Sequence, residues 1–304
     1  MSLKIAETKD FSEGLKTQIK EECSEALKLI EIKAESDPHD VVHEVRKAFK
    51  KIRGTLRLIR DHIDFYTEEN TFFRDEGRRV SALRDATSVI EALDGIYDQY
   101  DDQLYKKTFG KFRDYLVSRQ AQMASDQLDQ KGILKLIGKN LSEKCGQIDH
   151  WPIAIQSFED LSPSVIRVYK RGLKGYQRAD EGGSTEDFHE WRKRVKYLRY
   201  QLDLLNLIWP NFLDCWEDEL HELTNYLGDD HDLYNLHELV DENTDQFADP
   251  ESAQLLKSLI HSKRSELQAN ALQLGKRLYA LKPKHFTSLL EASWESFCAA
   301  EQQK

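Results

Sequence analysis

Apolar residues recur every three or four positions in two stretches of the chain. The first stretch is Val42, Val45, Phe49, Ile52, Leu56, Ile59 and Ile63, and the second is Phe188, Trp191, Val195, Leu198, Leu202, Leu205 and Trp209. This spacing places the apolar side chains on one stripe of an α-helix. The two stretches therefore predict two amphipathic helices, each with an apolar seam facing a core.

Similar patterns fill most of the remaining chain. With 14 Gly and 6 Pro in 304 residues, and no run of alternating β-branched residues, we expect an all-α protein with prolines only at helix starts and ends. Short connections favour antiparallel neighbours, so each half should form a four-helix bundle. The expected helices span 11–35, a basic helix from Asp37–Pro38, 67–102, 104–125, 128–147, a helix from Ser162–Pro163, a second basic helix capped by Ser184 and closed at Trp209–Pro210, 211–242, 250–281 and 283–300.

Positive charge runs beside both apolar seams. The segment HEVRKAFKKIRGTLRLIR at 43–60 holds seven Lys or Arg and one Glu, and an offset of 146 aligns it with HEWRKRVKYLRYQLDLL, which begins at His189. At 100° per residue the basic stripe lies roughly a quarter turn from the seam, so it flanks the core. The shared H-x-x-R-K-x-x-K-x-x-R pattern gives His43, Arg46, Lys47, Lys50 and Arg53 in the first copy, and His189, Arg192, Lys193, Lys196 and Arg199 in the second.

The repeat extends beyond the basic helices. Asp85 follows His43 by 42 residues, and Asp232, in LGDDHDL, follows His189 by 43 residues. The low-periodicity stretch 149–163 is the best candidate linker, so we expect halves at 1–150 and 151–304 that form one unit. Two copies of one bundle would meet about a pseudo-twofold axis, which brings both basic helices to a central basic groove or channel.

A third basic helix, VIRVYKRGLKGYQRA, carries Arg167, Lys170, Arg171 and Lys174 with no acid among them. The whole chain is acidic, with a formal net charge of −10, so it is a poor general binder of duplex nucleic acid or anionic membrane. Three acid-poor helices therefore indicate a local anion site. Arg suits phosphate through bidentate hydrogen bonds, and Lys acts as a mobile point charge.

The duplicated basic pattern, Arg84–Asp85, YKRGLKGYQRA and LGDDHDL together resemble the CHAD family, named for histidines in an α-helical domain. The resemblance covers nearly the whole chain. It implies two pseudo-symmetric four-helix bundles around a basic channel, inorganic polyphosphate as ligand and no established catalysis. Many relatives are fused to a CYTH domain marked by ExExK; this motif is absent here, so we expect a stand-alone member. The expected polyphosphate-binding residues are His43, Arg46, Lys47, Lys50, Arg53, Arg57, Arg84, Arg167, Lys170, Arg171, Lys174, His189, Arg192, Lys193, Lys196, Arg199 and His231.

The two halves differ at several aligned positions: Lys51 aligns with Tyr197, and Arg57 aligns with Asp203. Equal contributions from the two halves are therefore not expected. Two interpretations of the histidines stay open, namely a structural role within the bundle and contact with the ligand. We expect Asp85 and Asp232 to orient neighbouring cations or histidines, because a carboxylate facing phosphate is repulsive. Ion pairs with acids elsewhere in the bundle are the alternative explanation of the basic stripes.

Other functions have weaker sequence support. Asp40-x-x-His43 and Glu186-x-x-His189 have the spacing of di-iron bundles, so a dinuclear-metal protein or a metal-dependent phosphohydrolase or phosphotransferase is an alternative, although the flanking cations oppose a dication. Nucleophile arrangements, Gly-rich phosphate loops and zinc spacings are absent, so we expect a binding module with no catalytic residues and no cofactor. Single-stranded nucleic acid is a second alternative, disfavoured because Phe49 and Trp191 occupy seam positions and cannot stack on bases.

The cysteines and the hydropathy of the chain indicate the cellular compartment that we expect for the protein. Cys23, Cys145, Cys215 and Cys298 form no CxxC pair, and no signal peptide precedes them, which favours reduced thiols in the cytoplasm. No apolar run approaches 18 residues, so we expect no membrane partner. A polyphosphate ligand would associate the protein with polyphosphate granules. The sequence does not define an oligomeric state.

Overall fold

The computed structural model describes residues 11–100, 103–126 and 132–301. Within these ranges the chain forms α-helices and short 3₁₀ turns and contains no strand, which confirms the all-α prediction. The α-helices are α1 (Phe11–Lys33), α2 (Pro38–Leu58), α3 (Tyr66–Arg79), α4 (Ser81–Tyr100), α5 (Gln103–Ala124), α6 (Ile133–Cys145), α7 (Phe158–Asp180), α8 (Thr185–Leu204), α9 (Pro210–Glu242), α10 (Pro250–Leu278) and α11 (Pro283–Glu301).

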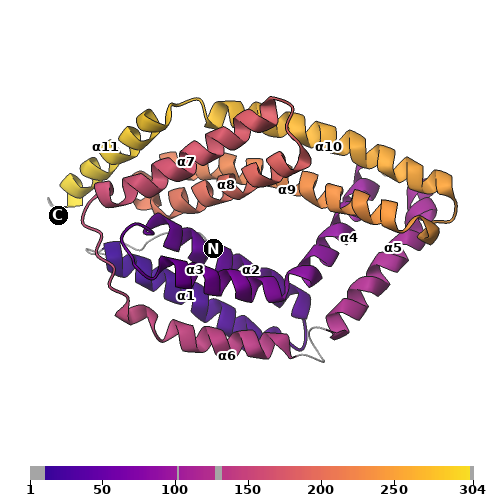
Figure 1. Cartoon of the computed structure of the whole chain (residues 1–304), viewed down its shortest axis with the longest axis horizontal. Helices are drawn as coiled ribbons and strands as arrows, with labels where there is room; N and C mark the ends of the chain where they lie inside the picture. The colour runs from indigo at the N-terminus through magenta and orange to yellow at the C-terminus, as the bar shows by residue number, and fades with distance from the viewer. Residues whose placement is uncertain (1–10, 101–102, 127–131, 302–304) are drawn as a thin grey trace.

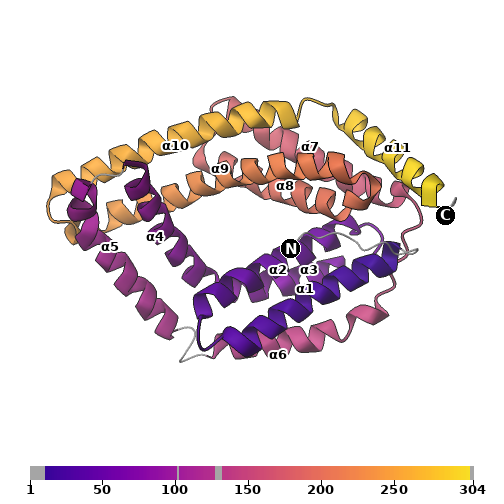
Figure 2. The ribbon, with the colours of Figure 1, turned by 180° about the vertical axis from the view of Figure 1, so that it is seen from behind.

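The two basic helices, α2 and α8, pack against each other. Helix α2 also contacts α1 and α3, and α8 lies between α7 and α9. Two further pairs, α4 with α9 and α5 with α10, join the N-terminal and C-terminal parts of the chain. Figures 1 and 2 show α4 starting beside α2 and, together with α5, reaching the ends of α9 and α10 far from α11. This contact pattern is what a twofold arrangement would give; the division into two bundles at 150/151 stays a prediction.

The buried apolar residues form two clusters. The larger core joins both parts of the chain, because it contains the seams of α2 and α8 together with side chains of α1, α6, α7 and α11. The second core is built from α4, α5, α9 and α10. Helix α9 belongs to both, since Leu227 packs in the larger core and Leu233 in the second core. The residues between them, Gly228 to Asp232, therefore lie at the junction of the two cores.

The apolar seams are buried as predicted, with one exception. Phe49 and Trp191 are 1% and 0% exposed, whereas Trp209, the last residue of the second seam, is 46% exposed. Helix α8 ends at Leu204, and a 3₁₀ turn follows before Pro210 begins α9. Trp209 stacks on Phe212 of α9, with ring centroids 4.5 Å apart. The assignment of Trp209 to the seam and to the end of the second basic helix was wrong, because the chain leaves the α8 axis at Leu204.

The single helix predicted over 67–102 is two helices that meet at Val80. Two side chains satisfy carbonyl groups in the last turn of α3 and so favour the break. Arg46 Nη1 of α2 donates to the Gly77 carbonyl oxygen at 2.7 Å. Ser81 Oγ donates to the Arg78 carbonyl oxygen at 2.9 Å. The break thus depends partly on a residue that lies 31 positions earlier in the chain.

The start of α7 also differs from the prediction. The helix begins at Phe158, where Ser157 and Asp160 form a capping box, and Pro163 lies inside the helix. In the segment predicted as a linker, residues 151–156 form no helix, and Trp151, Ile153 and Ile155 pack into the larger core. The linker therefore contributes to the core and does not merely connect two parts of the chain.

Gly54 sets the distance between α2 and α8. A Cβ at this position would lie 2.8 Å from the Tyr200 Cβ, so α2 and α8 would have to move apart. We expect Gly54→Ala to destabilise the protein by about 1–3 kcal/mol, as overpacked cores do. Gly95 of α4 is the matched control because an added Cβ there meets nothing within 4 Å. Gly95→Ala should stabilise by about 0.5–1 kcal/mol through helix propensity. Denaturant melts of both variants test the difference, and equal shifts would contradict it.

Candidate functional site

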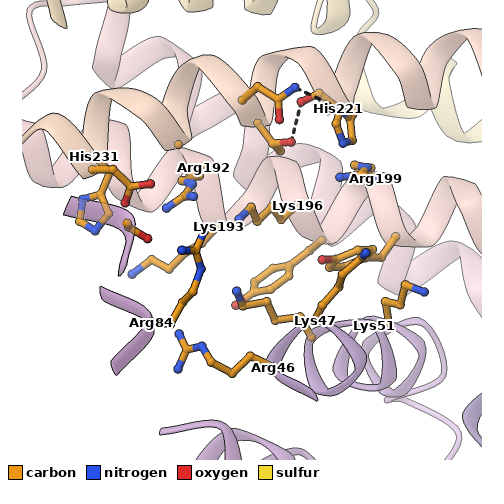
Figure 3. Close-up of a pocket in the computed structure, with 18 of the residues that line it drawn as sticks. Arg46, Lys47, Lys51, Arg84, Arg192, Lys193, Lys196, Arg199, His221 and His231 are labelled. Carbon is orange, nitrogen blue, oxygen red and sulfur yellow. Dashed lines mark hydrogen bonds between the residues drawn. The ribbon is translucent and has the colours of Figure 1, made fainter. Parts of the chain in front are cut away.

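A groove of 1050 Å³ lies between α2 and α4 on one side and α8 and α9 on the other. We call it the basic groove, because eleven Lys or Arg and six Asp or Glu line it. Figure 3 shows Arg46 and Lys51 on α2 across this space from Arg192 and Lys196 on α8. Thirteen of the seventeen residues predicted to bind polyphosphate line it, namely His43, Arg46, Lys47, Lys50, Arg53, Arg57, Arg84, His189, Arg192, Lys193, Lys196, Arg199 and His231.

The four predicted residues on α7 are not part of the basic groove. Arg167 and Arg171 instead line a smaller pocket beside it. Lys170 and Lys174 are exposed and line neither pocket. The acid-poor pattern of α7 was thus correct about local charge, but it did not show which cavity the helix faces.

Local capping fixes the start of each basic helix. Asp37 accepts a hydrogen bond from the Asp40 amide at 3.2 Å, and Pro38 occupies the first turn of α2. Ser184 and Asp187 form a reciprocal capping box at the start of α8. Both caps place acids at the helix N-terminus and leave the following turns basic. The paired apolar seams then hold the two basic stripes on facing sides of the groove.

Some groove cations have acidic partners. Lys47 pairs with Glu44 at 3.3 Å, and Arg84 pairs with Glu91 at 2.9 Å. Lys193 pairs with Glu190, and Arg199 pairs with Glu217. The alternative explanation by ion pairs therefore applies to these four cations of the groove.

The cations in the middle of the groove are different. In the ranges that the structure describes, Arg46, Lys50, Arg192 and Lys196 form no ion pair, and Arg46 donates only to the Gly77 carbonyl oxygen. The Nε atoms of Arg46 and Arg192 are buried and have no hydrogen-bond partner. Buried polar groups are rarely left without a partner in folded proteins. This unsatisfied set of donors, contributed by both copies of the repeat, makes the groove a candidate anion site.

The two central lysines titrate abnormally. Burial, followed by the positive charges of Arg46 and Arg192, lowers the pKa of Lys50 to about 8. Burial, followed by Arg192 and Lys50, holds the pKa of Lys196 well below its usual value. Both shifts have the causes expected for a cation surrounded by like charge and partly removed from water. An anion in the groove would raise both lysine pKa values, so the protein would take up protons when the anion binds.

Asp85 and Asp232 line the groove without making the contacts predicted for them. Neither carboxylate forms a hydrogen bond or ion pair with a described residue, although Asp85 raises the pKa of Lys50 and Asp232 raises that of Lys196 at longer range. Burial raises the pKa of Asp232 itself, against the effect of Arg192. The two acids therefore moderate the positive field and do not hold a particular cation in place.

The histidines of the two copies have different surroundings. The rings of His189 and His231 lie 4.1 Å apart between centroids, and the Nδ1 atom of each is buried without a partner. His43 is exposed and lies near Glu44 and Arg84. Burial is the main cause of the lowered pKa of all three, and it brings the pKa of His231 to about 4. Each shift favours the neutral imidazole in the free protein.

Sequence reasoning missed one wall of the groove. Helix α9 contributes Glu217, His221, Asn225 and Asn235 in addition to the predicted His231. A signal was present, since polar residues recur along α9 at intervals of three or four positions. His221 is fixed by Asn225, whose Nδ2 atom lies 3.2 Å from the histidine Nδ1 atom. Tyr197 and Tyr200 of α8 complete the lining.

In the described part of the chain, neither carboxylate–histidine pair that motivated the metal alternative belongs to a group of three potential ligands. Asp40 pairs with Lys33 at 3.4 Å and His43 lies near Glu44. Among the residues whose placement is described, the one group of three potential ligands within 4.8 Å is His237, Glu238 and Asp241, outside the groove lining. It contains neither carboxylate–histidine motif.

Comparisons with known proteins identify the class of fold and then the family. The structure is similar to the crystal structure of the CHAD domain from the plant Ricinus communis, with a TM-score of 0.63 and 15% sequence identity over 90% of this chain and 92% of that chain. The sequence model of the CHAD domain matches residues 19–241, so the chain belongs to the CHAD family. A comparison with curated protein sequences gives no match. In the described residues, no helix combines the length and the apolar character needed to cross a membrane.

The uncompensated charge predicts an unusual effect on stability. We expect Lys50→Met and Lys196→Met to stabilise the protein by roughly 1 kcal/mol or more, because each removes a poorly solvated charge from a positive field. Lys51→Met is the control, since Lys51 forms a 2.6 Å ion pair with the buried Glu22. Breaking that pair should destabilise by about 3–5 kcal/mol. Thermal melts test the contrast. Destabilisation by Lys50→Met comparable to that of Lys51→Met would show that Lys50 has a structural ion-pairing role.

Proposed function

We propose that this protein binds inorganic polyphosphate in the basic groove, as a cytoplasmic binding module without catalytic turnover. The observation that carries the proposal is the set of unpaired central cations, Arg46, Lys50, Arg192 and Lys196, in a groove of 1050 Å³. Polyphosphate is a linear polyanion whose negative charges repeat along the chain. It matches two basic stripes that run along α2 and α8.

The geometry favours an elongated ligand over a compact one. From Arg46 to Arg57 the α2 stripe extends about 16 Å, at 1.5 Å per residue. Cations of α8 face the same groove, so an extended anion could contact both stripes at successive positions. Arginines can each donate two hydrogen bonds to a phosphate, and lysines adjust to its position as point charges.

Single-stranded nucleic acid fits the groove less well. Such ligands usually stack their bases on aromatic side chains. Tyr200 is only 9% exposed, and the ring of Tyr197 is covered by the Arg57 guanidinium, 4.0 Å from its centroid. Neither tyrosine offers a free face for a base. The groove therefore provides charge for a phosphate backbone but no platform for bases.

Titration with polyphosphate and with single-stranded RNA, each at two salt concentrations, tests the ligand. Polyphosphate should bind more tightly, and its affinity should fall steeply with salt because several phosphate contacts release counterions together. Replacing Lys50, Arg192 and Lys196 with Gln should weaken binding strongly while circular dichroism shows unchanged helicity, because none of the three side chains bonds to another described residue.

Three outcomes would contradict the proposal. Polyphosphate affinity that is insensitive to salt would exclude a polyanion held by charge, and tighter binding of RNA would identify a different ligand. Phosphate released from polyphosphate with Mg²⁺, and lost on substitution of Asp85 or Asp232, would contradict the absence of turnover.

Binding should take up protons. The free protein lowers the pKa values of His43, His189 and His231, and a polyanion in the groove would raise them. Affinity should therefore rise as the pH falls from about 8 to about 6, around the ordinary histidine pKa of about 6.5. Isothermal titration in two buffers of different ionisation enthalpy measures the uptake directly.

Replacing His43, His189 and His231 with Asn separates the histidine contribution. Uptake near pH 6.5 should be lost in this variant, but uptake near pH 8 should remain because the pKa of Lys50 is about 8 in the free protein. Unchanged uptake near pH 6.5 would show that the histidines do not sense the ligand.

A further inference from the structure

A second, smaller pocket lies next to the basic groove. Its volume is 180 Å³, below the roughly 300–1,000 Å³ typical of ligand pockets. Five arginines line it, and no Asp or Glu does. We call it the five-arginine pocket, after Arg57, Arg60, Arg167, Arg171 and Arg194. These residues come from α2 and the turn after it, from α7 and from α8.

Two guanidinium groups of this pocket are incompletely bonded. Arg60 Nε and Arg167 Nη1 are buried and have no hydrogen-bond partner, and the nearest carboxylate oxygen to Arg60 Nε, from Asp61, is 3.7 Å away. The Nη2 atom of Arg167 does pair with Asp61 at 2.9 Å, so the same guanidinium has one satisfied side and one unsatisfied side. Unsatisfied buried donors are costly, and a bound acceptor would remove that cost.

Acids compensate only part of the charge. Asp61 pairs with Arg167 and, at 3.7 Å, with Arg60, while Glu190 pairs with Arg194 at 3.0 Å. Within the described residues, Arg57 and Arg171 form no ion pair. Five cations thus share two carboxylates, one of which also pairs with Lys193.

The five-arginine pocket is separate from the basic groove. Arg57 and Tyr197 line both cavities, and their contact, with the guanidinium carbon 4.0 Å from the ring centroid, forms the wall between them. Arg57 and Tyr197 both lie at positions where the two copies of the repeat differ. In the first copy the residue aligned with Tyr197 is Lys51, which is paired with Glu22. The pocket is therefore a product of the asymmetry between the copies.

We propose that the five-arginine pocket is a second anion site that binds one doubly charged phosphate group. A terminal phosphate has two ionisable oxygens, whereas a phosphate inside a polyphosphate chain has one. Converging guanidinium groups in a small pocket suit the group with the greater charge and the larger number of free acceptor oxygens. Free orthophosphate and the end of a polyphosphate chain share this chemistry. The proposal for free orthophosphate does not rest on the proposed function of the groove, whereas the proposal for the chain end does.

Orthophosphate is the first probe, and its binding is measured by isothermal titration calorimetry or by ³¹P line broadening. It also has access to the basic groove, so the titration uses the Lys50→Met, Lys196→Met protein, in which the groove is impaired. Arg171→Gln in this background should weaken orthophosphate binding by about tenfold or more, the usual effect of losing a charged hydrogen bond. Arg178→Gln is the matched control, because Arg178 is also an exposed arginine of α7 but does not line the pocket. It should change the affinity less than twofold.

A second comparison identifies the source of the phosphate group. Polyphosphate with free ends is compared with polyphosphate whose ends are esterified, using protein with an intact groove. If Arg171→Gln weakens the binding of free-ended polyphosphate but not that of end-esterified polyphosphate, the pocket binds the end of the chain. An effect of Arg171→Gln on orthophosphate alone would assign the pocket to the free anion.

The pocket proposal fails if Arg171→Gln and Arg178→Gln behave alike with both probes. Arg171 is exposed, so its replacement should leave the fold intact, and circular dichroism checks this. Failure of polyphosphate to bind the unaltered protein, together with Arg171-dependent orthophosphate binding, would overturn the proposed function and leave the second site standing. If polyphosphate binds equally well to the Arg171→Gln variant and orthophosphate does not bind at all, the second site is overturned and the proposed function stands.

Discussion

The packing of α2 against α8 holds two lines of like charge side by side. Two unit charges 4 Å apart near a protein surface repel by about 4 kcal/mol. Each fully buried large apolar side chain contributes about 1.5–3 kcal/mol, and thirteen residues of the two seams are buried. The apolar seams can therefore keep Arg46, Lys50, Arg192 and Lys196 together without carboxylate partners. The repulsion among these four cations lowers the stability of the fold, but it leaves a positive field in the groove before any ligand binds.

The two copies of the basic helix share a pattern but not a role. In the first copy Lys51 pairs with Glu22, and His43 lies near Arg84. In the second copy Tyr197 takes the place of Lys51, and His189 packs against His231. The first copy thus keeps its charge beside the groove, whereas the second forms a contact between two imidazole rings. The aligned residues of the two copies therefore differ in their partners, although both copies line the groove.

Helical periodicity predicted most of the fold, because each apolar seam is a local pattern that a single helix satisfies. The break at Val80 could not be predicted in this way, since it depends on Arg46 reaching the Gly77 carbonyl oxygen from another helix. The start of α7 was missed because Pro163 is a stronger local signal than the Ser157 cap.

The same distinction applies to the sites. The duplicated motif placed both basic stripes at one groove, because motif residues keep a fixed angle to the seam. The five-arginine pocket was not visible in the sequence. Arg60 and Arg194 are far apart along the chain, and only the tertiary packing brings them to one cavity.

Helix α9 passes from the larger core into the second core, and the residues that face the groove lie at the crossing point. Leu227 packs in one core and Leu233 in the other, so Gly228 to Asp232 lie where α9 passes between the two cores. A helix transmits bending and rotation along its axis because its backbone hydrogen bonds make it stiff. Because α9 is stiff, the position of His231 in the groove is tied to both cores at once.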